Sequence, residues 1–274
     1  MSAGITTADR TRGILNPAAG LKRFELRRLA PSPDLAKLVD WHWIVRWSLS
    51  EPFEQEVLPH ATVNLAIESC GSAVHGIGTR LDTSRLEGTG RVVATKFKPG
   101  GFFPFARLPM RDLVDRKVPI TEAFGDAARG IDAAVLDQPD DALATKAIEE
   151  MLGRCKRVED PGLDEAMALA ARAEEDREVH RVEDLAQIAG VSVRTLHRSF
   201  ERYIGVGPKW IIRRSRVHEA AERVRTGAPV VWSALAAELG YHDQAHLIRD
   251  FKAQIGFTPA AYAERCAAAL DGKA

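Results

Sequence analysis

Basic and amide side chains recur at helical spacing in two stretches near the carboxyl end of this 274-residue chain. Arg194, His197 and Arg198 lie at positions i, i+3 and i+4, which places them on one face of a helix. Arg249 follows Gln244 in a second stretch. Arginine can donate two hydrogen bonds to a guanine edge, glutamine can pair in the same way with adenine, and a long cation can reach a phosphate. These residue types predict contacts with the bases and backbone of duplex DNA.

Two copies of one pattern must position these side chains. The first copy reads Leu185-Ala186, Gly190, Ser192, Leu196, Arg198, Phe200, Gly205 and Pro208, and the second reads Leu235-Ala236, Gly240, Asp243, Leu247, Arg249, Phe251, Gly256 and Pro259. Gly190 and Gly240 favour the end of a first helix, because glycine adopts positive φ without steric cost. Ser192 and Asp243 are good N-caps for a second helix. Each copy therefore predicts a helix-turn-helix unit.

The second helix of each unit is expected to have an inward and an outward face. Leu196, Phe200 and Tyr203 form an apolar stripe in the first unit. Leu247 and Phe251 take the same role in the second unit. The outward faces and helix starts supply the candidate DNA-contacting residues, which are Ser192, Arg194, His197, Arg198, Lys209, Asp243, Gln244, Ala245, Ile248, Arg249 and Lys252.

Three of these candidates allow two interpretations. Ala245 and Ile248 are apolar where a reading face is expected to be polar. They can touch thymine methyl groups, or the second unit can mainly position the protein on the DNA backbone through Lys252. Lys209 follows Pro208, so it either meets a phosphate at a helix start or simply belongs to a proline-initiated helix.

The whole stretch resembles the DNA-binding domain of the AraC/XylS family of bacterial transcription regulators. The resemblance rests on Leu185-Ala186-x-x-Ala189-Gly190-x-Ser192-x-Arg194-x-Leu196-x-Arg198-x-Phe200 and on Gly240-Tyr241-x-Asp243-Gln244-x-His246-Leu247-x-Arg249-x-Phe251-Lys252-x-x-x-Gly256-Phe257-Thr258-Pro259-x-x-Tyr262. It implies two recognition helices, at about 192–203 and 243–253, in successive major-groove segments. A helix around Trp210–Arg223 would join them rigidly, and His246 would pack where the family commonly has an aromatic ring. The resemblance implies double-stranded DNA as the partner, with RNA polymerase, a small-molecule effector and a second copy of the chain as further candidates.

The region 21–120 shows the period of β-strands. Its clearest strand runs from Val39 to Leu49, and the shorter β-favouring runs that follow are Val57-Leu58, Thr62–Ile67, Val74–Ile77 and Arg91–Phe97. Short strands punctuated by Gly and Pro indicate a small barrel or sandwich. The run Phe97-Lys98-Pro99-Gly100-Gly101-Phe102 resembles a subgroup of the same family whose sensor domain has no settled role. The expected fold class is α+β, with an N-terminal small cupin-like β-barrel, a helical linker and a C-terminal all-α domain with two helix-turn-helix units.

The tryptophans of the clearest strand allow two interpretations. Trp41 and Trp43 can stack against an apolar or aromatic effector, or they can fill the core of a small barrel. The three histidines of this region lie apart, with no His-x-His pair among them. Metal ligation in a cupin-like barrel needs several histidines at close spacing, so no metal or cofactor is expected.

The region 121–176 changes to helical spacing. Asp140 and Asp141 stand at the start of one helix, where the helix dipole favours carboxylates. Leu163–Glu175 predicts a further helix. The apolar stripe of the first of these helices consists of Leu143, Ala147, Ile148, Met151 and Leu152. Such a stripe packs either on a neighbouring helix of the same chain or on a second copy of the chain, and periodicity does not separate these two cases.

Composition adds weaker constraints. The chain has 38 Lys and Arg and 38 Asp and Glu, but the segment 181–265 holds 13 basic and 9 acidic residues. This modest basic bias falls in the part expected to meet DNA. Cys70, Cys155 and Cys266 lie far apart and fit reduced thiols. No apolar run approaches the ~18 residues of a membrane span, so a cytoplasmic protein without a membrane partner is expected.

These observations predict five segments: a mobile tail at 1–20, a cupin-like sensor or dimerisation domain at 21–120, a helical linker at 121–176, an AraC-type DNA-binding domain at 177–266 and a tail at 267–274. The expected function is sequence-specific DNA binding in transcription regulation, not catalysis. One alternative is an effector-independent DNA binder whose first domain is purely structural. Another is a cupin-type enzyme, for which the sequence offers no metal cluster, nucleophile–base pair or phosphate loop.

Overall fold

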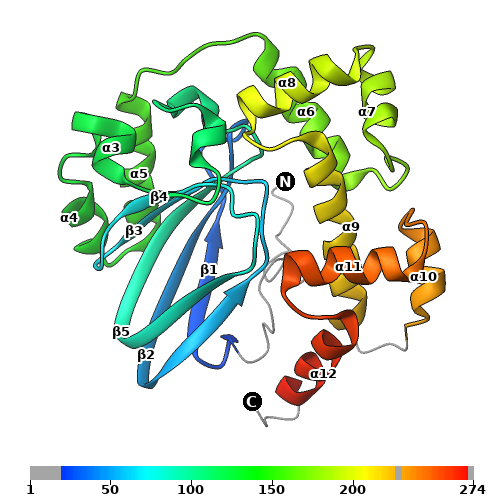
Figure 1. The fold of residues 1–274 in the computed structure, drawn as a ribbon. Coiled ribbons are helices and arrows are strands. Elements are labelled where there is room, and N and C mark those ends of the chain that lie inside the picture. The colour runs from blue at the N-terminus through cyan, green and yellow to red at the C-terminus, as the bar shows by residue number, and fades with distance from the viewer. Residues whose placement is uncertain (1–19, 226–229, 271–274) are drawn as a thin grey trace.

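The computed structural model describes residues 20–225 and 230–270. The fold is α+β, as the sequence predicts, with an antiparallel sheet followed by helices (Figure 1). The strands are β1 (Phe24–Leu29), β2 (Val39–Val57), β3 (Asn64–Glu68), β4 (Ala73–His75), β5 (Asp82–Phe97) and β6 (Lys117–Pro119). The helices are α3 (Ile120–Phe124), α4 (Ile131–Leu136), α5 (Asp141–Arg154), α6 (Gly162–Glu175), α7 (Val182–Ala189), α8 (Val193–Tyr203), α9 (Pro208–Arg225), α10 (Trp232–Glu238), α11 (Gln244–Ile255) and α12 (Pro259–Leu270).

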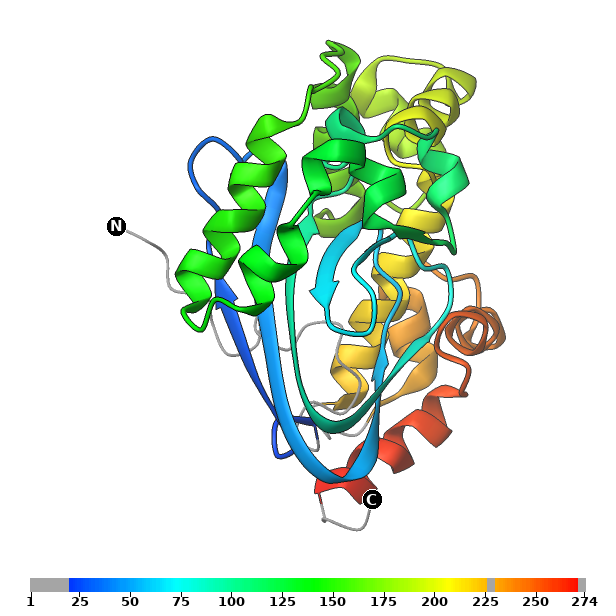
Figure 2. The same ribbon diagram turned by 90° about the vertical axis from the view of Figure 1, so that its left-hand side faces the viewer.

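The six strands form one sheet in the order β1-β2-β5-β3-β4-β6, and each neighbouring pair is antiparallel. The longest strands, β2 and β5, pair from Val39 and Phe97 to Val57 and Asp82. In Figure 2 this long pair bends along its length. The sequence predicts only parts of both strands. The segments it misses, 50–56 and 82–90, are mostly exposed and polar, so they lack the apolar alternation that marks a half-buried strand.

The two faces of the sheet are packed differently. His42 and Ile44 of β2 are fully buried in a large core that also contains side chains of α4 and α5. Trp43 and Trp47 lie on the opposite face, half-buried against a small cluster of Ala66, Val92 and Ala94. From Trp41 onward the side chains of β2 alternate between the two faces, whereas Val39 joins the large core because the strand register shifts between Val39 and Trp41. The large core nevertheless uses the face without the tryptophans, because the helices α3–α5 cover that face (Figure 1).

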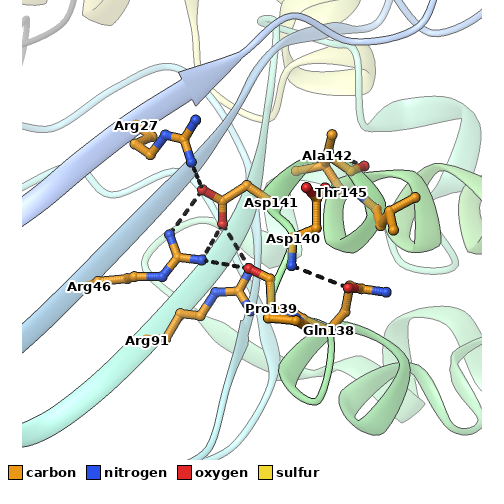
Figure 3. Close-up of polar contacts among 10 residues, drawn as sticks. Arg27, Arg46, Arg91, Gln138, Pro139, Asp140, Asp141, Ala142 and Thr145 are labelled. Atoms are coloured by element: carbon orange, nitrogen blue, oxygen red, sulfur yellow. Dashed lines mark hydrogen bonds and ion pairs between the residues drawn. The ribbon is translucent and has the colours of Figure 1, made fainter.

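Asp141 fastens α5 to the sheet (Figure 3). Its carboxylate accepts hydrogen bonds from Arg27 Nη1 at 2.6 Å, from Arg91 Nη2 at 2.9 Å and from both terminal nitrogens of Arg46. These arginines come from β1, β5 and β2, so one carboxylate joins three adjacent strands to the start of one helix. The sequence predicts only a dipole role for Asp141. Asp140 takes the capping role, since its Oδ1 accepts from the Leu143 amide at 2.9 Å.

The inward stripe of α5 begins one residue later than predicted. Leu143 is 52% exposed, whereas the side chains that face the core are Ala144, Ile148, Met151 and Leu152. These four lie at i, i+4, i+7 and i+8, the spacing of a helix face that covers a sheet. The stripe thus packs within the chain, against the sheet, and Leu143 points to solvent.

The helical region is divided between two cores. α6, α8 and the first half of α9, through Ile211 and Ile212, belong to the large core that includes the sheet. The second half of α9 packs with α10, α11 and α12 in a separate core, which Leu58 of the N-terminal region also joins. Figure 1 shows the two pairs α7–α8 and α10–α11 at opposite ends of α9. α9 therefore crosses the junction between the cores.

The predicted tails lie mostly outside the described residues. The structure gives no account of 1–19 and 271–274, and α12 continues through Leu270, past the predicted domain end at 266. Within 20–225 and 230–270, no helix combines the length and the apolar character that a membrane crossing needs.

Candidate nucleic-acid interface

The first helix-turn-helix unit consists of α7 and α8. Gly190 ends α7 with a φ of 65°, the left-handed conformation that the sequence predicts there. Ser192 is the N-cap of α8, because its Oγ accepts a hydrogen bond from the Thr195 amide at 3.1 Å. The predicted inward residues of α8 are all buried: Leu196, Phe200 and Tyr203.

The outward face of α8 carries two exposed arginines, Arg194 and Arg198, with the half-buried His197 between them. Neither arginine forms an ion pair with any residue that the structure describes. Arg202, on the same helix, shows the contrast, since its guanidinium lies 2.6 Å from the Asp160 carboxylate. An exposed guanidinium without a protein partner keeps its five donors for a ligand.

The second unit, α10 and α11, repeats this construction. Gly240 has a φ of 68°, and Asp243 Oδ1 accepts from the His246 amide at 2.7 Å. This backbone hydrogen bond, with a further contribution from His242, lowers the pKa of Asp243, so the cap is a carboxylate at neutral pH. The His246 ring meets Tyr241 edge-on with centroids 5.1 Å apart, which is the packing role expected for it. Leu247 and Phe251 are fully buried.

The outward face of α11 combines cations with one amide and one methyl group. The exposed side chains are Gln244, Ala245, Arg249 and Lys252. Within the described part of the chain, Arg249 and Lys252 form no ion pair. Ile248 is half-buried, so Ala245 offers the more accessible apolar contact of the two. The face therefore carries groups suited to bases and groups suited to phosphates.

α9 sets the distance between the two units. Its 18 residues correspond to a length of about 27 Å, at the usual rise of an α-helix. The two units lie at its ends (Figure 1). This length is of the same order as the ~34 Å between successive major-groove segments on one side of B-DNA. Lys209 is exposed in the first turn of α9, next to the buried Pro208.

All but one of the basic residues of the segment 177–268 fall into two groups, and the exception is Arg216, which donates to backbone carbonyl oxygens. Those with acidic partners are Arg177, Arg202, Arg213, Arg214, Arg223, Arg225 and Arg265. The exposed ones without an ion pair among the described residues are Arg181, Arg194, Arg198, Lys209, Arg249 and Lys252. All of these except Arg181 are candidates from the sequence. Arg181 is the N-cap of α7, and its place directly before a predicted helix is the signal that marks it.

The two tryptophans proposed for an effector lie in different surroundings. Over the Trp41 ring lie two cations, with Lys96 Nζ 4.0 Å and Arg28 Cζ 4.3 Å from the ring centroid. Trp43 Nε1 donates to Asn64 Oδ1 at 3.2 Å. Both rings are half-buried on the sheet face opposite the large core. The cations occupy space against Trp41 that a stacked ligand would need.

Among the described residues, His42 is the histidine of the sheet that contacts a carboxylate. Its Nδ1 lies 2.8 Å from Thr95 Oγ1, and its Nε2 lies 3.0 Å from Glu149 Oε1. The side chain is 1% exposed, and burial lowers the pKa of His42 against the opposing effect of Glu149. This pair links the sheet to α5. The residues that the structure describes include no group of three or more His, Cys, Asp or Glu placed to hold a metal.

Two known families match separate parts of the chain. Residues 27–119 match a domain of unknown function (DUF6597), and residues 185–265 match a helix-turn-helix domain. The second match covers both capped units and the helix between them. Residues 185–265 are an AraC-type helix-turn-helix domain. The AraC-type domain is a DNA-binding module of transcription regulation.

The individual proteins that resemble this chain either match only part of it or share few identical residues with it. An uncharacterized HTH-type transcriptional regulator of Haemophilus influenzae is 30% identical over 95 residues. That alignment covers 35% of this chain and 32% of the length of the relative. ToxT of Vibrio cholerae gives a TM-score of 0.39 at 11% identity, over 88% of this chain and 98% of ToxT. ToxT bound to (E)-4-(8-methylnaphthalen-1-yl)but-3-enoic acid gives 0.38 at 11% identity, over 89% and 99%.

Proposed function

We propose that this protein is a sequence-specific transcription regulator whose helices α8 and α11 enter successive major-groove segments of one DNA duplex. One observation carries the proposal. Both capped helices of the AraC-type domain present exposed cations on their outward faces that form no ion pair with a described residue, while most other arginines of the same domain are engaged by carboxylates. Base edges and phosphates are the ligands that such unengaged guanidinium and ammonium groups fit.

The outward residues divide into base readers and backbone contacts. Arg194 and Arg198 reach guanine edges in the first segment, and Arg249 does so in the second. Gln244, in the first turn of α11, pairs with adenine, and the exposed Ala245 touches a thymine methyl group. The backbone contacts are Ser192, His197, Lys209, Asp243 through the amides that follow it, and Lys252. Ile248, which is half-buried, makes an apolar contact at the edge of the major groove.

A regulatory role for the N-terminal domain follows as a second proposal. The sheet face with Trp43 and Asn64 offers an aromatic ring beside a polar group and is not covered by the large core. An apolar or aromatic effector bound there, or a second copy of the chain, would act on transcription through the placement of the AraC-type domain. RNA polymerase is then the further partner of the DNA-bound protein.

Sequence selection from a random duplex pool tests the DNA-binding proposal. We expect the parent protein to enrich two short conserved blocks whose centres lie about 10 base pairs apart, because each reading helix covers one major-groove segment. Enrichment of a single block would restrict base reading to one unit. Enrichment of no sequence at moderate salt, with and without added cell extract as a source of effector, would contradict the proposal.

A further inference from the structure

The middle of α9 carries three arginines that lie at the junction between the two cores. Arg213, Arg214 and Arg216 fall between Ile212, which packs in the large core, and Val217, which packs in the core of the second unit. In the sequence they form a basic run of the kind that often meets phosphates. In the structure each guanidinium is bound to a different part of the protein. Such contacts can fix how these parts of the protein are oriented relative to one another.

Arg213 binds the second reading helix. Its Nε donates to Asp250 Oδ2 at 2.8 Å, and its Nη2 donates to the other carboxylate oxygen. Asp250 belongs to α11, and its side chain is 5% exposed. The hydrogen bonds to Asp250 raise the pKa of Arg213. A bidentate pair of planar groups fixes direction as well as distance, so it sets the rotation of α11 against α9.

Arg216 binds both units at once. Its terminal nitrogens donate to the carbonyl oxygens of His180, just before α7, and of Gly240, in the turn of the second unit, the latter at 3.3 Å. The turn is packed closely against His180, since a Cβ built on Gly240 would lie 2.7 Å from His180 Nδ1. One guanidinium thus joins the start of the first unit to the turn of the second.

Arg214 binds the N-terminal domain. Its side chain is 5% exposed, and it donates to the Pro59 carbonyl at 2.7 Å, to Glu174 Oε1 of α6 at 2.6 Å and to His60 Nδ1 at 2.6 Å. Arginine has no acceptor atom, so His60 Nδ1 must be the acceptor in this contact. The N-terminal domain is therefore tied to the point of α9 from which the other two arginines reach the two units.

From these contacts we infer that Arg213 and Arg216 are positioning residues that determine which spacing between the two halves of a DNA site the protein accepts. The inference rests on the proposed function, because it needs both units to read DNA. The two guanidiniums hold α8 and α11 in one relative orientation, and Arg214 relates that orientation to the N-terminal domain. None of the three makes these contacts from a reading face. They act on DNA recognition through geometry.

The test uses the whole 274-residue chain and the duplex that the parent selects, with the spacer between its two blocks changed by one or two base pairs. Arg213→Lys and Arg216→Lys retain the charge and lose the planar fork. Arg225→Lys is the matched control, because among the described residues the ion pair of Arg225 is with Glu222 on the same helix. Thermal unfolding of each variant shows whether it is folded, and the glutamine variant at the same position replaces any lysine variant that is not.

We expect the parent and Arg225→Lys to bind altered spacers about tenfold more weakly per step, the scale of a mismatched base pair. Arg213→Lys and Arg216→Lys should bind all spacers within about threefold of one another, with unchanged base preferences inside each block. A uniform loss on all spacers, with a shallower salt dependence, would show a direct phosphate contact. An unchanged spacer preference would also overturn the inference. A parent that selects no two-block site would instead contradict the proposed function itself.

Discussion

Arg198→Ala is expected to weaken binding to the selected site by about 5- to 150-fold and to relax base preference in the first block alone. The range corresponds to the ~1–3 kcal/mol of discrimination that a bidentate arginine–guanine contact supplies. Arg198 is exposed, lies on the outward face of a capped helix and has no ion pair among the described residues. Removing it should therefore leave the folded protein unchanged. Fluorescence anisotropy on the parent site and on single-base variants of that site measures the effect.

Arg202→Ala is the matched control on the same helix. Arg202 is 60% exposed, but its guanidinium is bound to Asp160 at the end of the loop before α6. Losing one exposed, solvent-screened ion pair should change stability little and leave base preference intact. Equal relaxation by Arg198→Ala and Arg202→Ala would mean that net charge, rather than the outward face of α8, sets recognition. Relaxation of the second block by Arg198→Ala would contradict the assignment of α8 to the first.

Asp141→Asn is expected to lower the free energy of unfolding by about 2–3 kcal/mol at neutral pH. The Asp141 side chain is 3% exposed and receives Arg27, Arg46 and Arg91 (Figure 3). Removing the charge leaves three guanidiniums facing one neutral amide, which is costly in a buried site. The expected loss of stability is at the low end for a buried ion pair, because Arg27 and Arg46 are 51% and 32% exposed and remain partly solvated. Urea unfolding measures it.

The same pair of proteins gives a pH test. Burial alone would raise the pKa of Asp141, but the hydrogen bonds from Arg46 and the charges of Arg46, Arg27 and Arg91 outweigh burial and lower it. A carboxyl whose pKa is lowered by folding stabilises the protein fully above its unfolded pKa of about 3.9, and this contribution is lost as the pH falls through the folded pKa. The parent–variant difference should therefore be constant near neutral pH and shrink below about pH 4.

Asp137→Asn supplies the control for both measurements. Asp137 is exposed at the end of α4 and forms no ion pair with a described residue. Its replacement should change the free energy of unfolding by less than about 0.5 kcal/mol. If Asp141→Asn is as mild as Asp137→Asn, or if its effect grows as the pH falls, the carboxylate does not fasten α5 to the sheet in the way that its three arginine contacts indicate.

The sequence predicts the AraC-type domain closely, because its signals are local. A capping oxygen at Ser192 or Asp243, a glycine at positive φ and an inward Phe at fixed spacing each act within one or two helical turns. Local chemistry of this kind is repeated in both units, so each copy supports the other. The inward and outward faces of α8 follow directly from it.

The sheet is predicted less completely, because its packing depends on distant residues. Nothing in the β2 sequence says that α5, about a hundred residues later, covers the His42 face and leaves the Trp43 face half-buried. The same holds for Asp141, whose partners Arg27, Arg46 and Arg91 are 50 to 114 residues away. The helical spacing of the apolar residues in α9 could have indicated that much of this helix is buried. It could not have shown which carboxylates or carbonyl oxygens its arginines reach.

The geometry of two reading helices on one side of the duplex is tested most directly by a hydroxyl-radical footprint of the parent protein on its selected site. Two protected patches should appear on the same face of the DNA, with centres about 10 base pairs apart, and Arg249→Ala should weaken the second patch more than the first. Two patches on opposite faces, or one short patch that Arg249→Ala does not alter, would contradict the placement of α8 and α11 in successive major-groove segments.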